Sequence, residues 1–241
     1  MKNVFALVLV ALFTLSVNAQ WGKKIKGNGK LVTIERSVGD YDAIAVAGWF
    51  DVNLVNGREG ELSIKGEENL LEYIKTEVKN GKLTIKVKKG YNLQSANKKN
   101  GILVTVPIES INSVSLSGSG DIVSKDVLKA GEFSASISGS GDISLAIEAD
   151  VLKTAISGSG DIELSGKARN FEVQVSGSGD VGAFDLTADH VTANVSGSAD
   201  IRVTANESIT ARVSGSGDIL YKGNPEKVNS KASGSGDINK A

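Results

Sequence analysis

A six-residue phrase, SGSGDI, occurs five times unaltered between residues 117 and 238, and twice more with a single substitution. The aspartates of the seven copies are spaced by 21, 19, 19, 20, 18 and 19 residues. They are Asp121, Asp142, Asp161, Asp180, Asp200, Asp218 and Asp237. A nearly constant period of this length indicates a solenoid, in which each repeat is one coil stacked on the coil before it. Residues 111–241 are therefore predicted to form a seven-repeat solenoid.

Apolar residues and glycines alternate with polar residues on both sides of the phrase. Between Phe133 and Leu145, every odd-numbered residue is apolar or Gly. A period of two predicts β-strands with these residues facing inward and the serines and aspartates facing outward. We therefore expect an all-β parallel β-helix with right-handed coils. An array of antiparallel hairpins is the alternative, although such arrays usually carry turn signals at shorter intervals.

An eighth, altered copy, AGWFDV, precedes the seven and starts at Ala47. Its fourth position is Phe50, and one later copy has Ala199 there, so this position is predicted to be an inward slot that is usually kept small. The second position is Gly in all eight copies, which predicts a special backbone angle or a close backbone approach. These structural glycines are Gly48, Gly118, Gly139, Gly158, Gly177, Gly197, Gly215 and Gly234.

The segment between the first copy and the others has a different pattern. Residues 67–74 predict a short helix, and the Asn80-Gly81 pair between two alternating runs predicts a tight hairpin. Residues 89–100 read as an exposed loop. We expect residues 20–31 to be a linker and residues 32–110 to hold the first coils with this excursion, continuous with the solenoid.

The N-terminus has the features of a secretory signal peptide. A short cationic start is followed by an apolar stretch and by the small-x-small pattern Val17-Asn18-Ala19. We expect residues 1–19 to be removed by cleavage between Ala19 and Gln20. The protein is then exported to the periplasm, the cell surface or the medium, without a transmembrane segment. The chain contains no Cys, so we expect neither disulfides nor a lipid anchor.

The composition restricts the partners. The formal net charge is −1, so the bulk charge favours neither nucleic acid nor an anionic membrane. We expect no nucleic-acid partner. A surface glycan or an envelope protein could bind the polar Ser/Asp face. The last coil could also pair with a second copy and form a homodimer, because an uncovered coil has an unpaired edge.

Four hypotheses address the row of repeat aspartates. Calcium could bridge neighbouring coils, but it needs six to eight oxygens, and the known glycine-aspartate calcium repeat has a nine-residue period. A polysaccharide-active enzyme needs two unlike carboxylates, whereas repetition makes these alike. The single histidine, His190, has no matching Ser or Cys nucleophile in the sequence pattern. We favour a non-enzymatic chain without a cofactor, in which each carboxylate accepts backbone N–H and Ser hydroxyl bonds at the coil corner.

Binding of a glycan or a protein along the Ser/Asp face is the fourth hypothesis. Trp49 is the one candidate ligand-binding aromatic on this face, because it stands where the other seven copies have Ser. Its alternative role is packing under the excursion of residues 53–110.

Several segments together are similar to a known family. Tyr41-Asp42-Ala43-Ile44 leads into GWFDV, and GEENLLEYIKTEVKNGKLTIKV and VTVPIESINSVSLSGSGDI follow. The combination resembles the putative autotransporter adhesin head GIN domain family over about residues 32–238. The resemblance implies an exported, all-β, solenoid-like domain. We interpret the chain as a non-enzymatic β-solenoid that serves at the cell envelope as an adhesion, binding or structural module. No C-terminal membrane barrel follows the repeats, so we expect no self-transport across an outer membrane.

Overall fold

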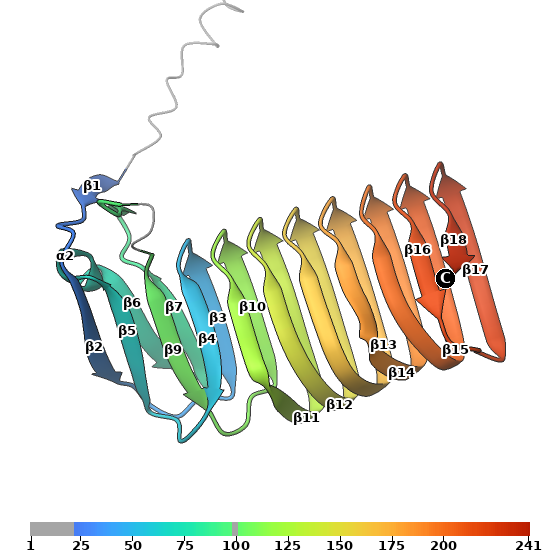
Figure 1. Ribbon diagram of the computed structural model, residues 1–241, viewed down its shortest axis with the longest axis horizontal. Helices are drawn as coiled ribbons and strands as arrows, with labels where there is room; N and C mark the ends of the chain where they lie inside the picture. The colour runs from blue at the N-terminus through green and yellow to red at the C-terminus, as the bar shows by residue number, and fades with distance from the viewer. Residues whose placement is uncertain (1–21, 98–100) are drawn as a thin grey trace, which may run out of the picture.

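The computed structural model describes residues 22–97 and 101–241, and it shows a parallel β-solenoid closed at its N-terminal end by antiparallel strands (Figure 1). The expected signal peptide and the Ala19–Gln20 cleavage site lie outside the described residues. The described chain contains no helix that is long and apolar enough to cross a membrane.

Each solenoid coil consists of two strand segments that meet at an SGSGD corner. The chain enters the corner at the end of one strand, leaves it at the start of the next, and turns back at a bend at the opposite end (Figure 1). The strands are β10 (Ser113–Gly118), β11 (Ile122–Gly139), β12 (Ile143–Gly158), β13 (Ile162–Gly177), β14 (Val181–Gly197), β15 (Ile201–Gly215), β16 (Ile219–Lys222), β17 (Lys227–Gly234) and β18 (Ile238–Lys240).

Neighbouring coils pair in parallel with equivalent repeat positions side by side. Gly139 pairs with Gly158, Gly158 with Gly177, and Gly177 with Gly197. The parallel solenoid predicted from the repeat is therefore confirmed, and the hairpin array is excluded for this part of the chain. The register shifts only between corners, for example between Val123 and Val127. The bends thus absorb the variation in repeat length, while the corners stay aligned.

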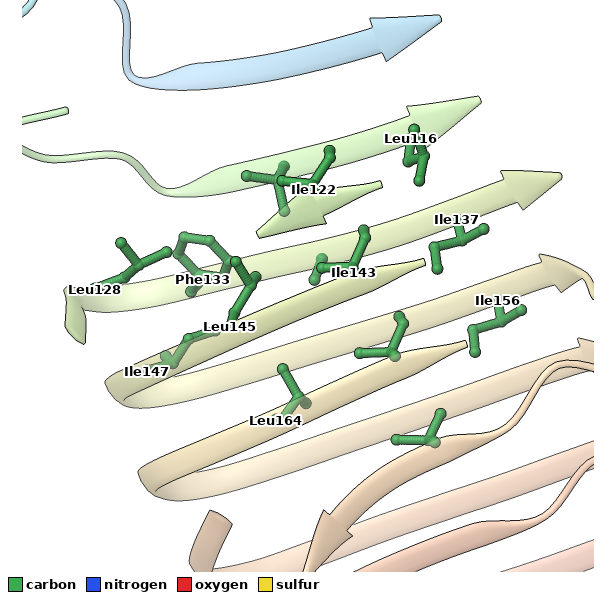
Figure 2. Close-up of a cluster of buried hydrophobic side chains, with 14 of the residues drawn as sticks. Leu116, Ile122, Leu128, Phe133, Ile137, Ile143, Leu145, Ile147, Ile156 and Leu164 are labelled. Atoms are coloured by element: carbon green, nitrogen blue, oxygen red, sulfur yellow. The ribbon is translucent and has the colours of Figure 1, made fainter. Parts of the chain in front are cut away.

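The core lies between the two strand layers of the coil. Inward residues form rows of like side chains, such as Leu116, Ile137 and Ile156 along one layer and Ile122 and Ile143 along the other (Figure 2). All five are at most 2 % exposed. Burial of one such side chain stabilises the fold by about 1.5–3 kcal/mol. Because each coil repeats the same inward positions, each new coil extends the same core.

The N-terminal module extends both layers and covers the first coil. Its elements are β1 (Lys23–Lys26), β2 (Leu31–Ser37), β3 (Ala43–Gly48), β4 (Asp51–Asn56), β5 (Glu61–Glu67), α2 (Glu68–Leu71), β6 (Ile74–Lys79), β7 (Lys82–Val87), β8 (Tyr91–Gln94) and β9 (Leu103–Ile108). Strands β7 and β9 continue the two layers from β3 and β4. Strands β2 and β5 then pair antiparallel with their neighbours, as does β6 with β7.

Two sequence predictions for this module are confirmed and two need correction. The short helix is α2, and the β6–β7 hairpin turns at Asn80 and Gly81, with φ of 50° and 73°. The expected loop of residues 89–100, however, contains β8, and the expected linker of residues 20–31 contains β1. These strands pair with each other in parallel. The reason is burial, because Leu93 of β8 is only 5 % exposed and packs in the core.

Candidate functional site

The SGSGD corners form one continuous edge along the solenoid, and backbone and side-chain hydrogen bonds join each corner to the next. The Asp N–H of each coil donates to the Asp Oδ1 of the preceding coil, at 2.7–3.2 Å from Asp51 through Asp237. The second Ser N–H of each copy donates to the Gly carbonyl of the preceding coil at 2.8–3.0 Å. The Asp carbonyl accepts from the residue that follows Asp in the preceding coil, as Asp161 does from Ile143 at 2.9 Å.

These contacts assign a partner to every aspartate carboxylate from Asp51 to Asp218. The partner is the backbone N–H of the next aspartate. The expected hydrogen bonds from Ser hydroxyls to these carboxylates are not found: within residues 22–97 and 101–241, no repeat serine hydroxyl donates to a repeat aspartate. The carboxylates therefore connect coils through the main chain, which fixes the spacing of neighbouring corners.

The second-position glycines have a steric reason in the structure. In the seven SGSGD-type copies their φ lies between 118° and 148°, a region that other residues rarely adopt. An added Cβ would lie 2.0–2.2 Å from the carbonyl oxygen of the equivalent Gly one coil earlier. Gly48 differs, because there the Cβ would meet the Phe50 ring at 2.3 Å. The fourth position is buried in every copy, including Phe50 and Ala199.

The outer surface of the edge is a polar ridge, defined here by the two serines and the aspartate of each copy. The serines are exposed, and the aspartates are exposed or half-buried. Asp200 lies 3.5 Å from the Arg202 guanidinium. At the N-terminal end, the pKa of Asp51 is raised, mainly because the carboxyl is partly buried. The hydrogen bond from the Asp121 N–H opposes this shift, and the nearby charge of Asp121 adds to it. The ridge thus carries like charges, and the Oδ1 atoms from Asp51 to Asp218 are already hydrogen-bonded.

The ridge offers a calcium ion few protein oxygens in each coil. Each coil offers one carboxylate, and from Asp51 to Asp218 its Oδ1 accepts a hydrogen bond from the next coil. Among the described residues, no three His, Cys, Asp or Glu side chains lie close enough together to hold a metal ion. A bridging ion would have to take its six to eight oxygens largely from water and from the remaining Oδ2 atoms.

The structure brings His190 beside a serine that the sequence pattern did not reveal. His190 Nδ1 lies 3.0 Å from Ser208 Oγ on the next coil, and Nε2 lies 3.7 Å from a Glu207 carboxylate oxygen. His190 and Ser208 are 18 residues apart, which equals the repeat length at that coil, so the repeat spacing does indicate that they lie side by side. The imidazole is 45 % exposed and the Glu207 side chain 66 %. Activation of a serine depends on a water-excluded, preorganised environment, which this exposed strand surface lacks.

Trp49 stands at the N-terminal end of the polar ridge, between β3 and β4. Its side chain is half-buried and packs against the core, while the neighbouring Phe50 is 1 % exposed. Trp49 also lines a pocket of about 550 Å³ together with Asp51, Leu93 and Gln94. Trp49 thus packs beside the excursion and also faces an open pocket, and ligand binding at this pocket stays a prediction.

Part of the Trp49 pocket comes from residues that the sequence did not single out. Leu93 and Gln94 belong to β8, which the sequence pattern did not predict as a strand. Tyr91 of β8 also forms an aromatic pair with Tyr73, which precedes β6: their ring centroids are 4.5 Å apart, and Lys88 Nζ lies 5.9 Å from the Tyr73 ring. The module that covers the solenoid end therefore also gathers several of the chain's few aromatic residues.

Solved structures share this fold. A protein described as a putative adhesin from Bacteroides fragilis is 26% identical, with a TM-score of 0.85 over 90% of this chain and 100% of its own. A protein described as a putative lipid binding protein from Parabacteroides distasonis is 29% identical, with a TM-score of 0.75 over 91% of this chain and 100% of its own. A putative adhesin from the same species is 27% identical, with a TM-score of 0.72 and coverage of 91% and 100%.

No curated protein matches this chain. The family model described as "Putative auto-transporter adhesin, head GIN domain" matches residues 40–225, which include the first corner, the excursion and six of the seven SGSGD-type corners. The resemblance noted in the sequence is therefore confirmed. This chain belongs to the auto-transporter adhesin head GIN domain family.

Proposed function

We propose that this protein is an exported, non-enzymatic adhesion module of the cell envelope, and that it binds a surface glycan at the Trp49 pocket. The family description and the similar structures described as adhesins support the adhesion part of the proposal. The signal-peptide pattern of residues 1–19 supports export, and the lack of Cys supports release without a lipid anchor.

The observation that carries the glycan part is the replacement of a repeat serine by Trp49 next to a pocket. An indole offers a broad apolar face, which suits the apolar face of a sugar ring, together with an N–H donor. Asp51 and Gln94 add a carboxylate and an amide to the same pocket. Binding sites of this kind combine apolar walls with a few polar groups that fix the orientation of the ligand.

The polar ridge gives a bound glycan a surface on which to continue. Each SGSGD-type coil presents two exposed serine hydroxyls, and neighbouring parallel strands are about 4.7–4.9 Å apart. A linear glycan anchored at Trp49 could therefore contact the hydroxyls of successive coils. The alternative is that an envelope protein binds the same ridge, but none of the residues that line the Trp49 pocket specifically favours a protein over a glycan.

The test is a glycan-array screen of the purified protein and of Trp49→Ser. This substitution installs the residue that the other seven copies carry, so the corner should still fold. Phe184→Ser is the matched control, because it removes a half-buried aromatic side chain on β14, far from the pocket. We expect a defined set of glycans to bind the wild type and Phe184→Ser but not Trp49→Ser.

Two results would contradict the proposal. One is the absence of any glycan signal for the wild type, and the other is equal binding by Trp49→Ser. Incubation with a bound glycan, followed by mass spectrometry, tests the non-enzymatic part, for which we expect no cleavage products.

A further inference from the structure

The C-terminal end of the solenoid has an unpaired strand edge. Strand β17 pairs with β15 on one side, in continuous register from Lys227 to Gly234, and with no strand on its other side in the described chain. All eight of its residues are exposed, which is true of no other strand within residues 22–97 and 101–241. In Figure 1 the strand forms the outer boundary of the stack, opposite the covered N-terminal end.

The inward positions of β17 remain open for a further strand. Val228, Ser230 and Ala232 pair with the buried residues Ile209, Ala211 and Val213 of β15, respectively. Val228 is nevertheless 50 % exposed, because no strand of the described chain covers it. Proteins commonly protect an edge strand with lysines, a bulge, a proline, a very short strand or an inward charge. Of these devices strand β17 has only the lysines, since it is eight residues long, regular and free of proline and inward charge.

The outward positions of β17 are basic. Lys227 and Lys231 lie on this face, and Lys231 pairs in register with Arg212 of β15. All three residues are exposed, and none of them forms an ion pair in the part of the chain that the structure describes. An approaching strand would therefore meet cationic side chains on its outer face and a small apolar strip on its inner face.

We propose that β17 is a docking edge for an extended segment of a partner protein that carries acidic residues on alternate positions. The segment adds one strand to the sheet. Its main chain pairs with the free edge of β17, and its acidic side chains lie beside Lys227, Lys231 and Arg212. Strand addition of this type takes its affinity from main-chain hydrogen bonds and its specificity from alternate side chains.

The charges disfavour a second copy of this chain as the occupant. An isologous pairing of two β17 strands would bring Lys227 and Lys231 of both copies to the same face of the joined sheet, and like charges on neighbouring strands destabilise a pair. An acidic segment neutralises the same charges.

The test uses the full-length secreted chain and a fluorescent peptide as long as β17, in which Glu alternates with Val. A matched peptide has Lys in place of Glu, and a second has Pro in place of alternate Val, which prevents ladder pairing. Fluorescence anisotropy at low and high salt measures binding, and analytical ultracentrifugation measures the oligomeric state. We expect saturable, salt-sensitive binding of the Glu/Val peptide alone, to a monomeric protein.

The double variant Lys227→Glu/Lys231→Glu should weaken binding of the Glu/Val peptide by about tenfold or more. The control is Lys24→Glu/Lys26→Glu, which makes the same charge change on exposed residues of β1 at the opposite end, and should leave the affinity within about twofold. Equal binding of the Glu and Lys peptides, equal binding by the two double variants, no saturable binding, or a dimer that buries β17 would each overturn the proposal.

Discussion

Replacement of a second-position glycine by alanine should strongly destabilise the solenoid, and Gly158→Ala is the most informative case. Gly158 has a φ of 145°, and an added Cβ would lie 2.2 Å from the carbonyl oxygen of Gly139. A residue held in such a region costs about 1–3 kcal/mol, and overpacking against a fixed neighbour costs about 1–3 kcal/mol more. We therefore expect the free energy of unfolding to fall by about 2–6 kcal/mol, a large part of a typical total of about 5–15 kcal/mol.

The measurement is thermal and urea unfolding followed by circular dichroism. For a chain of this size, the expected loss lowers the thermal midpoint by about 4–24 °C. Gly131→Ala is the matched control, because an added Cβ there meets no atom within 4 Å and φ is not positive. That variant should be as stable as the wild type or slightly more stable. A Gly158→Ala protein with wild-type stability would refute the reasoning.

Three further predictions concern Glu67, Glu77 and the removal of metal ions. Glu67 is buried, and its carboxylate accepts the Gly29 N–H at 2.5 Å and the Ala96 N–H at 2.8 Å. In Glu67→Gln the side-chain NH₂ would face one of these two N–H donors, so we expect the free energy of unfolding, measured in urea, to fall by about 1–3 kcal/mol. Hydrogen bonds from Lys75 and Lys79 lower the pKa of Glu77 from 4.5 to about 2, so its stabilising effect is present above pH 4.5 and is lost as the pH falls toward 2. The difference in unfolding midpoint between the wild type and Glu77→Gln should shrink over this pH range, and a constant difference would contradict the assignment. EDTA should leave the thermal midpoint unchanged, whereas a drop that Ca²⁺ restores would support a calcium site at the ridge.

The sequence predicts the solenoid well because its information is local and repeated. The alternation around each phrase identifies the inward rows, and the constant spacing of Asp142, Asp161 and Asp180 places their corners side by side. The hydrogen bond from each aspartate N–H to the carboxylate of the preceding coil can be predicted only when the register between neighbouring coils is also known. His190 and Ser208 show the same dependence, since only the repeat length of 18 residues at that coil brings them together.

The N-terminal module is less predictable because its contacts join short segments that are far apart in the sequence. Residues 23–26 pair with residues 91–94, and neither segment is long enough to show a clear period. Glu67 contacts the main chain of two remote loops, at Gly29 and Ala96, and no side-chain pattern encodes such partners. The Trp49 pocket depends on the same module, so its aromatic residue was identified from the repeat but its walls were not.

The most direct test of the corner architecture compares Asp161→Asn with Asp161→Ala. Asp161 Oδ1 accepts the Asp180 N–H at 2.7 Å, and an asparagine keeps an oxygen acceptor at this position while it removes the charge. We expect Asp161→Asn to cost less than about 1 kcal/mol and Asp161→Ala, which leaves the N–H without its partner, to cost about 1–3 kcal/mol in urea unfolding. Equal losses for the two variants, or no loss for either, would contradict a corner in which each carboxylate holds the main chain of the next coil.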